Sequence, residues 1–122
     1  GCFRMNGNEL ATEAYYRLPV ITVIFNNRNL GMVRQWQSLI YDRRYSQTSL
    51  ENRSPDFVKF ADAFGLKGRR VTQPSELEEA ITEALAESAQ GRGYVIDCAI
   101  NADEMVHPMV NGGHHITEFL LS

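Results

Sequence analysis

Three asparagines follow a short apolar run and are the residues best suited to bind a ligand. Asn26, Asn27 and Asn29 lie in a polar turn directly after the β-branched run Val20–Phe25. Asparagine oxygens and turn carbonyls are hard ligands of the kind that Mg2+ or Ca2+ prefers. Asparagine is also a common turn former, so an Asn-Asn pair after a strand can equally be a purely structural turn.

A helix beginning at Gly31 or Met32 would place an anion site beside that turn. Apolar residues recur at helical spacing after it, at Met32, Val33, Trp36, Leu39 and Ile40. The first backbone N–H groups of such a helix point at a bound anion. A metal beside a helix N-terminus is a physically sensible diphosphate site.

The elements that position these residues predict an α/β fold with a parallel sheet covered by helices. The runs 20–25, 68–72 and 94–100 have the composition of strands, and helical segments separate them. The continuous apolar run 20–25 predicts a strand covered on both faces. A polar loop is expected over 42–54 and an irregular tail over 101–122.

Three further helices are expected around this sheet. The first spans Asn8–Tyr16. The next runs to Phe64, with Ser54 as its N-cap and a proline at its first position. The last covers Glu76–Gln90, with Ser75 as its N-cap.

The sheet is thin for this architecture, because only three strands are expected. The helix Asn8–Tyr16 also has no strand before it. We therefore expect residues 1–122 to be the C-terminal portion of a larger domain, with the upstream strands and other domains absent.

Composition excludes several classes of partner. A net charge of −3 over 122 residues gives no electrostatic reason to expect nucleic acid or an anionic membrane. Cys2 and Cys98 do not make a disulfide framework, which favours an intracellular protein, cytoplasmic if bacterial. The apolar run 18–25 is too short to span a bilayer.

The remaining polar residues give weaker signals. The pair His114–His115 and the separate His107 could bind a metal, but adjacent histidines have poor ligand geometry and no cluster of further ligands lies near them. They are expected to be structural or exposed. Glu9 is expected on a helix surface or in a packing network.

Longer segments carry a resemblance to one enzyme family. They are FRMNGNELAT (3–12), LPVITVIFNNRNLGMVRQWQ (18–37), YDRRYSQT (41–48), PDFVKFADAFGLKG (55–68) and VHPMVNGG (106–113). Together they resemble the thiamine-diphosphate motif region of acetohydroxyacid (acetolactate) synthase. That family's motif is Gly-Asp-Gly, a spacer in the mid-twenties, then Asn-Asn. With Gly1 as the last glycine, residues 2–25 form a spacer of 24 before Asn26 and Asn27.

The resemblance implies a role for each residue of the turn. Asn27 would give its side-chain oxygen to Mg2+ and Asn29 its main-chain carbonyl. The motif's aspartate should lie immediately before Gly1, so these residues would make half of a metal site. Tight Mg2+ binding by them alone is not expected, because neutral oxygens must displace tightly held water.

The same resemblance implies contacts to the rest of the cofactor and to substrate. Gly1 and Cys2 would offer backbone N–H groups to the diphosphate, and Gly31 and Met32 would begin the helix behind the cofactor. The positions that match the family's substrate pocket and herbicide-binding channel are Met32, Val33 and Trp36. Met32 and Val33 could instead be core residues, Trp36 could simply cover a helix face, and Cys2 could be an inert small side chain.

The activity implied for the complete enzyme is acetolactate synthesis for branched-chain amino acids. It would decarboxylate pyruvate and join the hydroxyethyl unit to a second 2-oxoacid, pyruvate or 2-oxobutyrate. The family's catalytic glutamate lies in another domain of a neighbouring subunit, so no catalytic residue is expected in this chain, which should be inactive alone. Many members also carry FAD, bound outside this segment. A homodimer or tetramer with a regulatory small subunit is expected.

Two alternatives remain open. The chain could belong to a related thiamine-diphosphate enzyme, such as a pyruvate oxidase or a glyoxylate carboligase. It could also be a non-catalytic α/β module in which the asparagine turn is only structural.

Overall fold

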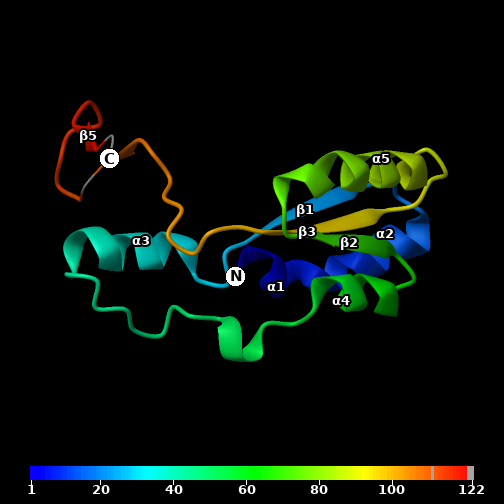
Figure 1. The fold of residues 1–122 in the computed structure, drawn as a ribbon, viewed down its shortest axis with the longest axis horizontal. Helices are drawn as coiled ribbons and strands as arrows, with labels where there is room; N and C mark the ends of the chain where they lie inside the picture. The colour runs from blue at the N-terminus through cyan, green and yellow to red at the C-terminus, as the bar shows by residue number, and fades with distance from the viewer. Residues whose placement is uncertain (111, 121–122) are drawn as a thin grey trace.

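Three parallel strands form the main sheet, as the sequence predicts. The computed structural model describes residues 1–110 and 112–120. The strands β1 (Ile21–Asn26), β2 (Lys67–Val71) and β3 (Tyr94–Ala99) are ordered β1-β3-β2, and β3 pairs in parallel with both neighbours. Helices lie on both faces of this sheet (Figure 1), so the α/β prediction is confirmed.

Helix α5 covers one face of the sheet and a group of shorter helices covers the other (Figure 1). These elements are α5 (Leu77–Ser88) on the first face, and α1 (Cys2–Asn6), α2 (Leu10–Tyr16) and α4 (Phe57–Ala63) on the second. Each face has its own apolar core. The α5 side buries Val71, Ala80, Ala84, Tyr94, Ile96 and Cys98, and the other buries Leu10, Ile24, Phe57, Ala61, Leu66 and Val95.

The expectation that residues 20–25 form a fully covered strand is wrong. β3 occupies the centre of the sheet, and its residues 94–98 are all buried. β1 is an outer strand, so Val23 and Phe25 remain 44% and 74% exposed. The apolar run is therefore only half-buried, because α5 contacts β1 at few positions and no further strand pairs with β1 in the described chain.

Two of the predicted helix caps are also wrong. Asp56, not Ser54, caps α4, because its Oδ1 accepts hydrogen bonds from the backbone N–H groups of Val58 and Lys59 at 3.1 Å each. A short 3-10 helix, η3 (Pro74–Glu76), precedes α5 and replaces the expected cap at Ser75. There the Glu76 carboxylate accepts from the backbone N–H groups before it.

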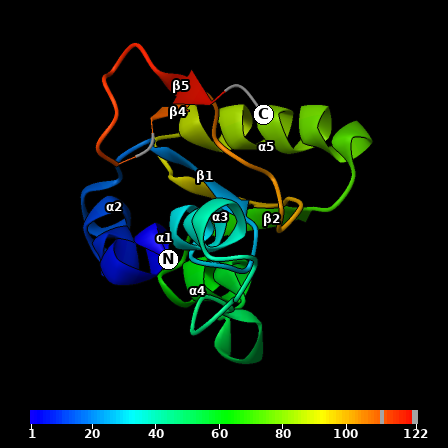
Figure 2. The same ribbon diagram turned by 90° about the vertical axis from the view of Figure 1, so that its left-hand side faces the viewer.

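Helix α3 and the C-terminal residues extend beyond the carboxyl ends of the strands (Figures 1 and 2). α3 (Gly31–Ile40) follows the asparagine turn, as predicted. The tail is not wholly irregular, because β4 (Met109–Val110) and β5 (Phe119–Leu120) pair antiparallel. Among the described residues, no helix has both the length and the apolar character needed to cross a bilayer.

Two more 3-10 helices complete the order of elements. η1 (Gly7–Glu9) joins α1 to α2, and η2 (Glu51–Arg53) lies within the polar loop expected over 42–54. Both cysteines are free, and Cys2 is exposed whereas Cys98 is buried.

Candidate cofactor and metal site

The turn after β1 is held by hydrogen bonds between its own asparagines. The Oδ1 atom of Asn27 accepts from the backbone N–H of Asn29 at 3.0 Å, and the Nδ2 of Asn29 donates to the carbonyl of Asn27 at 2.8 Å. Arg28, between them, has a positive φ of 56°. Asn29 is buried, so the two predicted metal ligands are fixed relative to each other.

A second segment braces this turn from the side. The backbone N–H of Leu30 donates to Thr48 at 2.9 Å, and that of Leu50 donates to Arg28 at 2.8 Å. Asn29 and Ser49 form an isolated antiparallel bridge between these bonds. The loop expected to be merely polar therefore supports the turn.

The N-terminus of α3 opens beside the turn. Its N-cap residue, Leu30, makes no side-chain capping bond, so the first N–H groups of the helix lack a side-chain acceptor. Gly31 lies directly against Asn27: a Cβ on Gly31 would be 2.6 Å from Asn27 Nδ2. Only a residue without a side chain lets the Asn27 amide rest against the helix start.

One cavity of about 410 Å³ gathers the predicted cofactor and metal residues. Its lining includes Gly1, Cys2, Asn27, Asn29, Gly31 and Met32. Gly1 is packed close to the α3 N-cap, since a Cβ there would be 2.8 Å from Leu30 Cδ2. The chain thus brings its first residues and the turn after β1 to one place, although they are far apart in sequence.

The predicted substrate-pocket residues are divided between two cavities. Met32 lines the cavity at the asparagine turn, whereas Val33 and Trp36 line a separate one of about 470 Å³ beside the loop after α3. Met32 and Val33 are each 49% exposed, which does not support the alternative that they are core residues. Both are therefore accessible to a small molecule.

The described residues supply no complete metal centre. No group of three or more His, Cys, Asp or Glu side chains in this part of the chain is placed to hold an ion. His114 contacts Glu118 and His115 contacts Thr117, and both histidines are exposed, as expected. The oxygens of the asparagine turn are neutral, so they could contribute ligands to a Mg2+ site but none of the negative charge that such a site uses.

Two buried polar residues that were not expected from the sequence hold segments of this region together. Asp97, 3% exposed in the central strand, accepts a hydrogen bond from Asn26 Nδ2 at 2.9 Å. Gln35, 4% exposed on α3, bonds both the N–H and the carbonyl of Val106 at 2.9 Å. Their signal was a polar residue at an apolar position: Asp97 interrupts the run of β3, and Gln35 lies at helical spacing from Met32 and Leu39.

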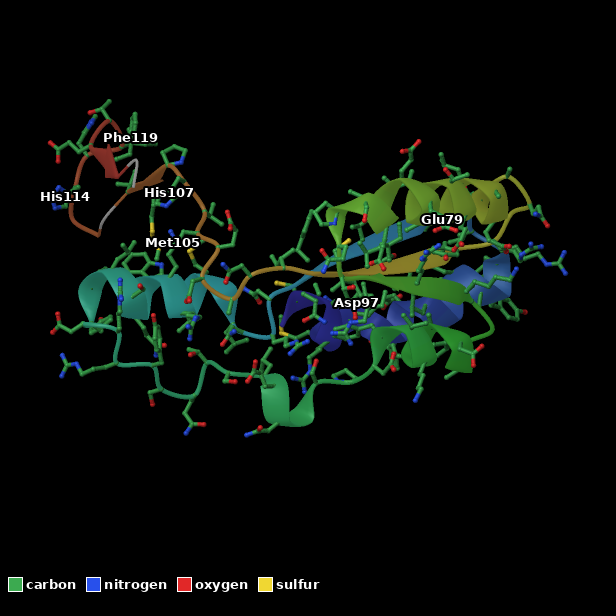
Figure 3. The ribbon with its side chains drawn as sticks, in the orientation of Figure 1. Glu79, Asp97, Met105, His107, His114 and Phe119 are labelled. Carbon is green, nitrogen blue, oxygen red and sulfur yellow. The ribbon has the colours of Figure 1, made fainter. Side chains whose placement is uncertain are left out.

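The tail is tied to α3 by an ion pair as well. Arg34 Nε and Nη2 both reach Asp103 Oδ1, at 3.0 and 2.7 Å. The Arg34 guanidinium also stacks over the ring of Tyr45, 3.9 Å from its centroid. In Figure 3, Met105 and His107 lie on the segment that passes over α3.

Comparisons with known proteins agree with these features. Residues 1–98 match the family "Thiamine pyrophosphate enzyme, C-terminal TPP binding domain". The chain is 42% identical over 122 residues to the acetolactate synthase isozyme 3 large subunit of Escherichia coli, covering all of this chain and 21% of that protein. It is 47% identical over 116 residues to the acetolactate synthase large subunit IlvB1 of Mycobacterium tuberculosis, covering 93% of this chain and 18% of that protein.

A solved structure agrees at the level of the fold. The thiamine diphosphate-dependent 4-hydroxybenzoylformate decarboxylase of Rhodococcus jostii superposes with a TM-score of 0.66 and 26% identity, covering 79% of this chain and 17% of that chain. The chain spans about a fifth of the length of the curated relatives described above. The resemblance stated from the sequence is confirmed, while the roles of individual residues remain predictions.

Proposed function

Because this chain belongs to the thiamine pyrophosphate enzyme family through its C-terminal TPP-binding domain, we propose that it anchors the diphosphate–Mg2+ end of that cofactor in an acetolactate synthase. In this proposal, residues 1–122 are the C-terminal portion of the cofactor-binding domain of a longer catalytic subunit. The relatives of 42–47% identity support this enzyme over a related oxidase or carboligase.

The observation that carries the proposal is the convergence of two segments on one cavity. Gly1 and Cys2 come from one segment, and Asn27, Asn29 and Gly31 come from the other. The turn offers hard oxygens for a metal, and the α3 N-terminus offers N–H groups for an anion. A diphosphate chelating Mg2+ needs both kinds of group within one site.

Each residue then has a defined task. The Asn27 side-chain oxygen and the Asn29 carbonyl would bind Mg2+, with the remaining charge supplied by a carboxylate outside this chain. The N–H groups of Gly1 and Cys2 would bind the diphosphate, and Gly31 and Met32 would begin the helix behind it. When bound, thiamine diphosphate supplies the electron sink that a 2-oxoacid needs to lose CO2.

The substrate end of the site would lie along the exposed face of α3. Met32, Val33 and Trp36 would exclude water from the reacting 2-oxoacid and orient its small alkyl group. The complete enzyme would use pyruvate twice, or pyruvate with 2-oxobutyrate, in branched-chain amino-acid biosynthesis. FAD, a second catalytic subunit and a regulatory small subunit would bind through other parts of it.

Acetolactate formation from pyruvate tests this proposal. The complete catalytic subunit that carries this segment is expected to form acetolactate only with both Mg2+ and thiamine diphosphate, and residues 1–122 alone are expected to form none. Turnover of the complete subunit to acetate, or to tartronate semialdehyde from glyoxylate, would instead assign it to an oxidase or carboligase. Acetolactate formation by the 122-residue chain alone would contradict the proposal that part of the site lies outside these residues.

A further inference from the structure

A buried carboxylate in the central strand lies behind the asparagine turn without belonging to its proposed ligand set. Asp97 is 3% exposed, and its neighbours in β3, Ile96 and Cys98, are buried apolar residues. Figure 3 shows it within the sheet layer, away from the tail and α3. A buried carboxylate is costly unless it is hydrogen-bonded, so its partner identifies its task.

The partner of Asp97 is the first asparagine of the turn. In the β1–β3 register Asp97 is opposite Ile24, and Ala99 is opposite Asn26, so Asp97 and Asn26 are diagonal neighbours on one face of the sheet. The Asn26 Nδ2 donates to Asp97 Oδ1 at 2.9 Å. This bond fixes which way the Asn26 amide faces, since only its NH2 end can donate to a carboxylate.

The orientation of Asn26 is passed on to the turn. With its Nδ2 held by Asp97, its Oδ1 accepts from the backbone N–H of Arg28 at 3.2 Å. Arg28 is the positive-φ residue between Asn27 and Asn29. A chain of two hydrogen bonds therefore runs from the central strand to the peptide that joins the two proposed metal ligands.

We infer that Asp97 is a positioning residue for the metal-binding turn, acting through Asn26 to fix the geometry in which Asn27 and Asn29 meet Mg2+. This inference rests on the proposed function, since it assigns a role within that same site. Asp97 itself touches neither metal nor substrate. Groups that hydrogen-bond a metal ligand directly typically contribute about 10- to 100-fold to metal affinity, and because Asp97 acts one residue further out, through Asn26, we expect the lower end of that range.

The test is a set of variants in the complete catalytic subunit, with Mg2+ and thiamine diphosphate as the probes. Asp97→Ala removes the acceptor, and Asn26→Asp places two carboxylates face to face. Each is expected to raise the Mg2+ concentration needed for half-maximal cofactor binding by about 10-fold or more. The KM for pyruvate, measured at saturating Mg2+, should change by less than about 2-fold, since the substrate contacts lie elsewhere.

The reciprocal double variant separates positioning from mere structural support. In Asn26→Asp/Asp97→Asn the donor and acceptor exchange places, the charge is conserved, and the new carboxylate at position 26 can still accept from the Arg28 N–H. The Mg2+ requirement of this variant should return to within about 3-fold of the unmodified enzyme, as expected when a coupled pair is restored. Glu87→Gln, a buried carboxylate on α5 that contacts neither the turn nor the cavity at it, is the matched control and should leave that requirement unchanged.

Several outcomes would overturn the inference. These are a folded Asp97→Ala enzyme with an unaltered Mg2+ requirement, a double variant that folds but keeps the defect of the single variants, and a double variant that does not fold. If Asp97→Ala does not fold, the double variant decides. An unmodified subunit that shows no Mg2+-dependent cofactor binding would instead contradict the proposed function, and this is seen before any variant is compared.

Discussion

The α-carbon of Gly31 lies against the side-chain amide of Asn27, so that a methyl group on the glycine would stand 2.6 Å from Asn27 Nδ2. The first residue of α3 and the proposed metal ligand are thereby packed as one unit. The same amide group accepts from Asn29 N–H at 3.0 Å, so its position is set from two directions. The proposed metal ligand and the helix N-terminus are therefore expected to move together.

Gly31→Ala should therefore weaken Mg2+-dependent binding of thiamine diphosphate without unfolding the protein. Gly31 lies outside the left-handed region of φ, so the backbone accepts alanine there, and the free energy of unfolding should change by less than about 1 kcal/mol. The displaced Asn27 amide should raise the Mg2+ requirement by about 10-fold. Gly112→Ala, where nothing lies within 4 Å of the added carbon, is the control and should change neither calorimetric titration nor melting temperature.

The two candidate N-caps of α4 predict different losses of stability: Asp56 is the cap in the structure, and Ser54 is the cap expected from the sequence. Asp56→Ala should lower the free energy of unfolding by about 1 kcal/mol, because two backbone N–H groups lose their acceptor. Ser54→Ala should lower it by less than about 0.5 kcal/mol, as for a surface change away from a cap. Urea denaturation of both variants measures this, and equal losses would contradict the cap at Asp56.

Glu87 predicts a loss of stability at acid pH. Hydrogen bonds from Arg92 Nε at 2.6 Å and from Lys67 Nζ at 2.7 Å lower the pKa of this carboxyl from 4.5 to about 2. A depressed folded-state pKa stabilises the fold above pH 4.5, and the stabilisation is lost as pH falls from there toward 2. Glu87→Gln should remove this part of the pH dependence of the unfolding free energy, and Glu104→Gln, at an exposed site, is the control for replacing a glutamate.

The Glu13 carboxyl predicts a change of stability with pH that is opposite in sign to that of Glu87. Its Oε2 is buried and has no hydrogen-bond partner in the described structure, and burial raises the pKa of the carboxyl above 4.5. A raised folded-state pKa gives stability that is complete below pH 4.5 and is lost as pH rises through the folded value. Glu13→Gln should remove that decline and raise the unfolding free energy at neutral pH. A Glu13→Gln variant whose unfolding curves match those of the unmodified protein from about pH 4 to 7 would argue against a buried carboxylate there.

The sequence predicts the arrangement of elements because the relevant signals are local. The apolar β3 run and the periodicity of α5 lie within their own segments, so each could be recognised without its neighbours. The exposure of Val23 and Phe25 could not be predicted in this way, because the composition of β1 is the same whether a strand or water lies beside it. Strand order, which placed β3 rather than β1 at the centre, depends on contacts between segments far apart in the chain.

The N-cap of α4 shows a second reason why the sequence does not predict every detail. Ser54 and Asp56 are both good N-cap residues and flank one proline, so the pattern alone admits two alternative helix starts. The structure selects Asp56, and the helix begins with the buried Phe57. Ser54 instead ends η2 with an extended backbone (ψ 125°), and the Asp56 side chain is the one that accepts from the first N–H groups of the helix.

The location of the asparagine turn could be predicted from the sequence, but the residues that hold it in place could not. Asn27, Asn29 and Gly31 were expected at one site because a strand, a turn and a helix follow one another there, and the cavity does gather them. Asp97 lies 71 residues after Asn26 in the chain, and only the β1–β3 register brings it behind that asparagine. Its place in an apolar strand marked it as unusual, but the sequence could not name its partner.

The most direct test of the proposed metal site is a calorimetric titration of the complete catalytic subunit with thiamine diphosphate, with and without Mg2+, using the unmodified protein and Asn27→Ala. We expect Mg2+-dependent binding that Asn27→Ala weakens by at least about 10-fold, since a direct ligand is lost. Asn101→Ala, at an exposed asparagine of the tail, should bind as the unmodified protein does. Cofactor binding that does not depend on Mg2+, or that is equally tight in Asn27→Ala, would contradict a metal site at this turn.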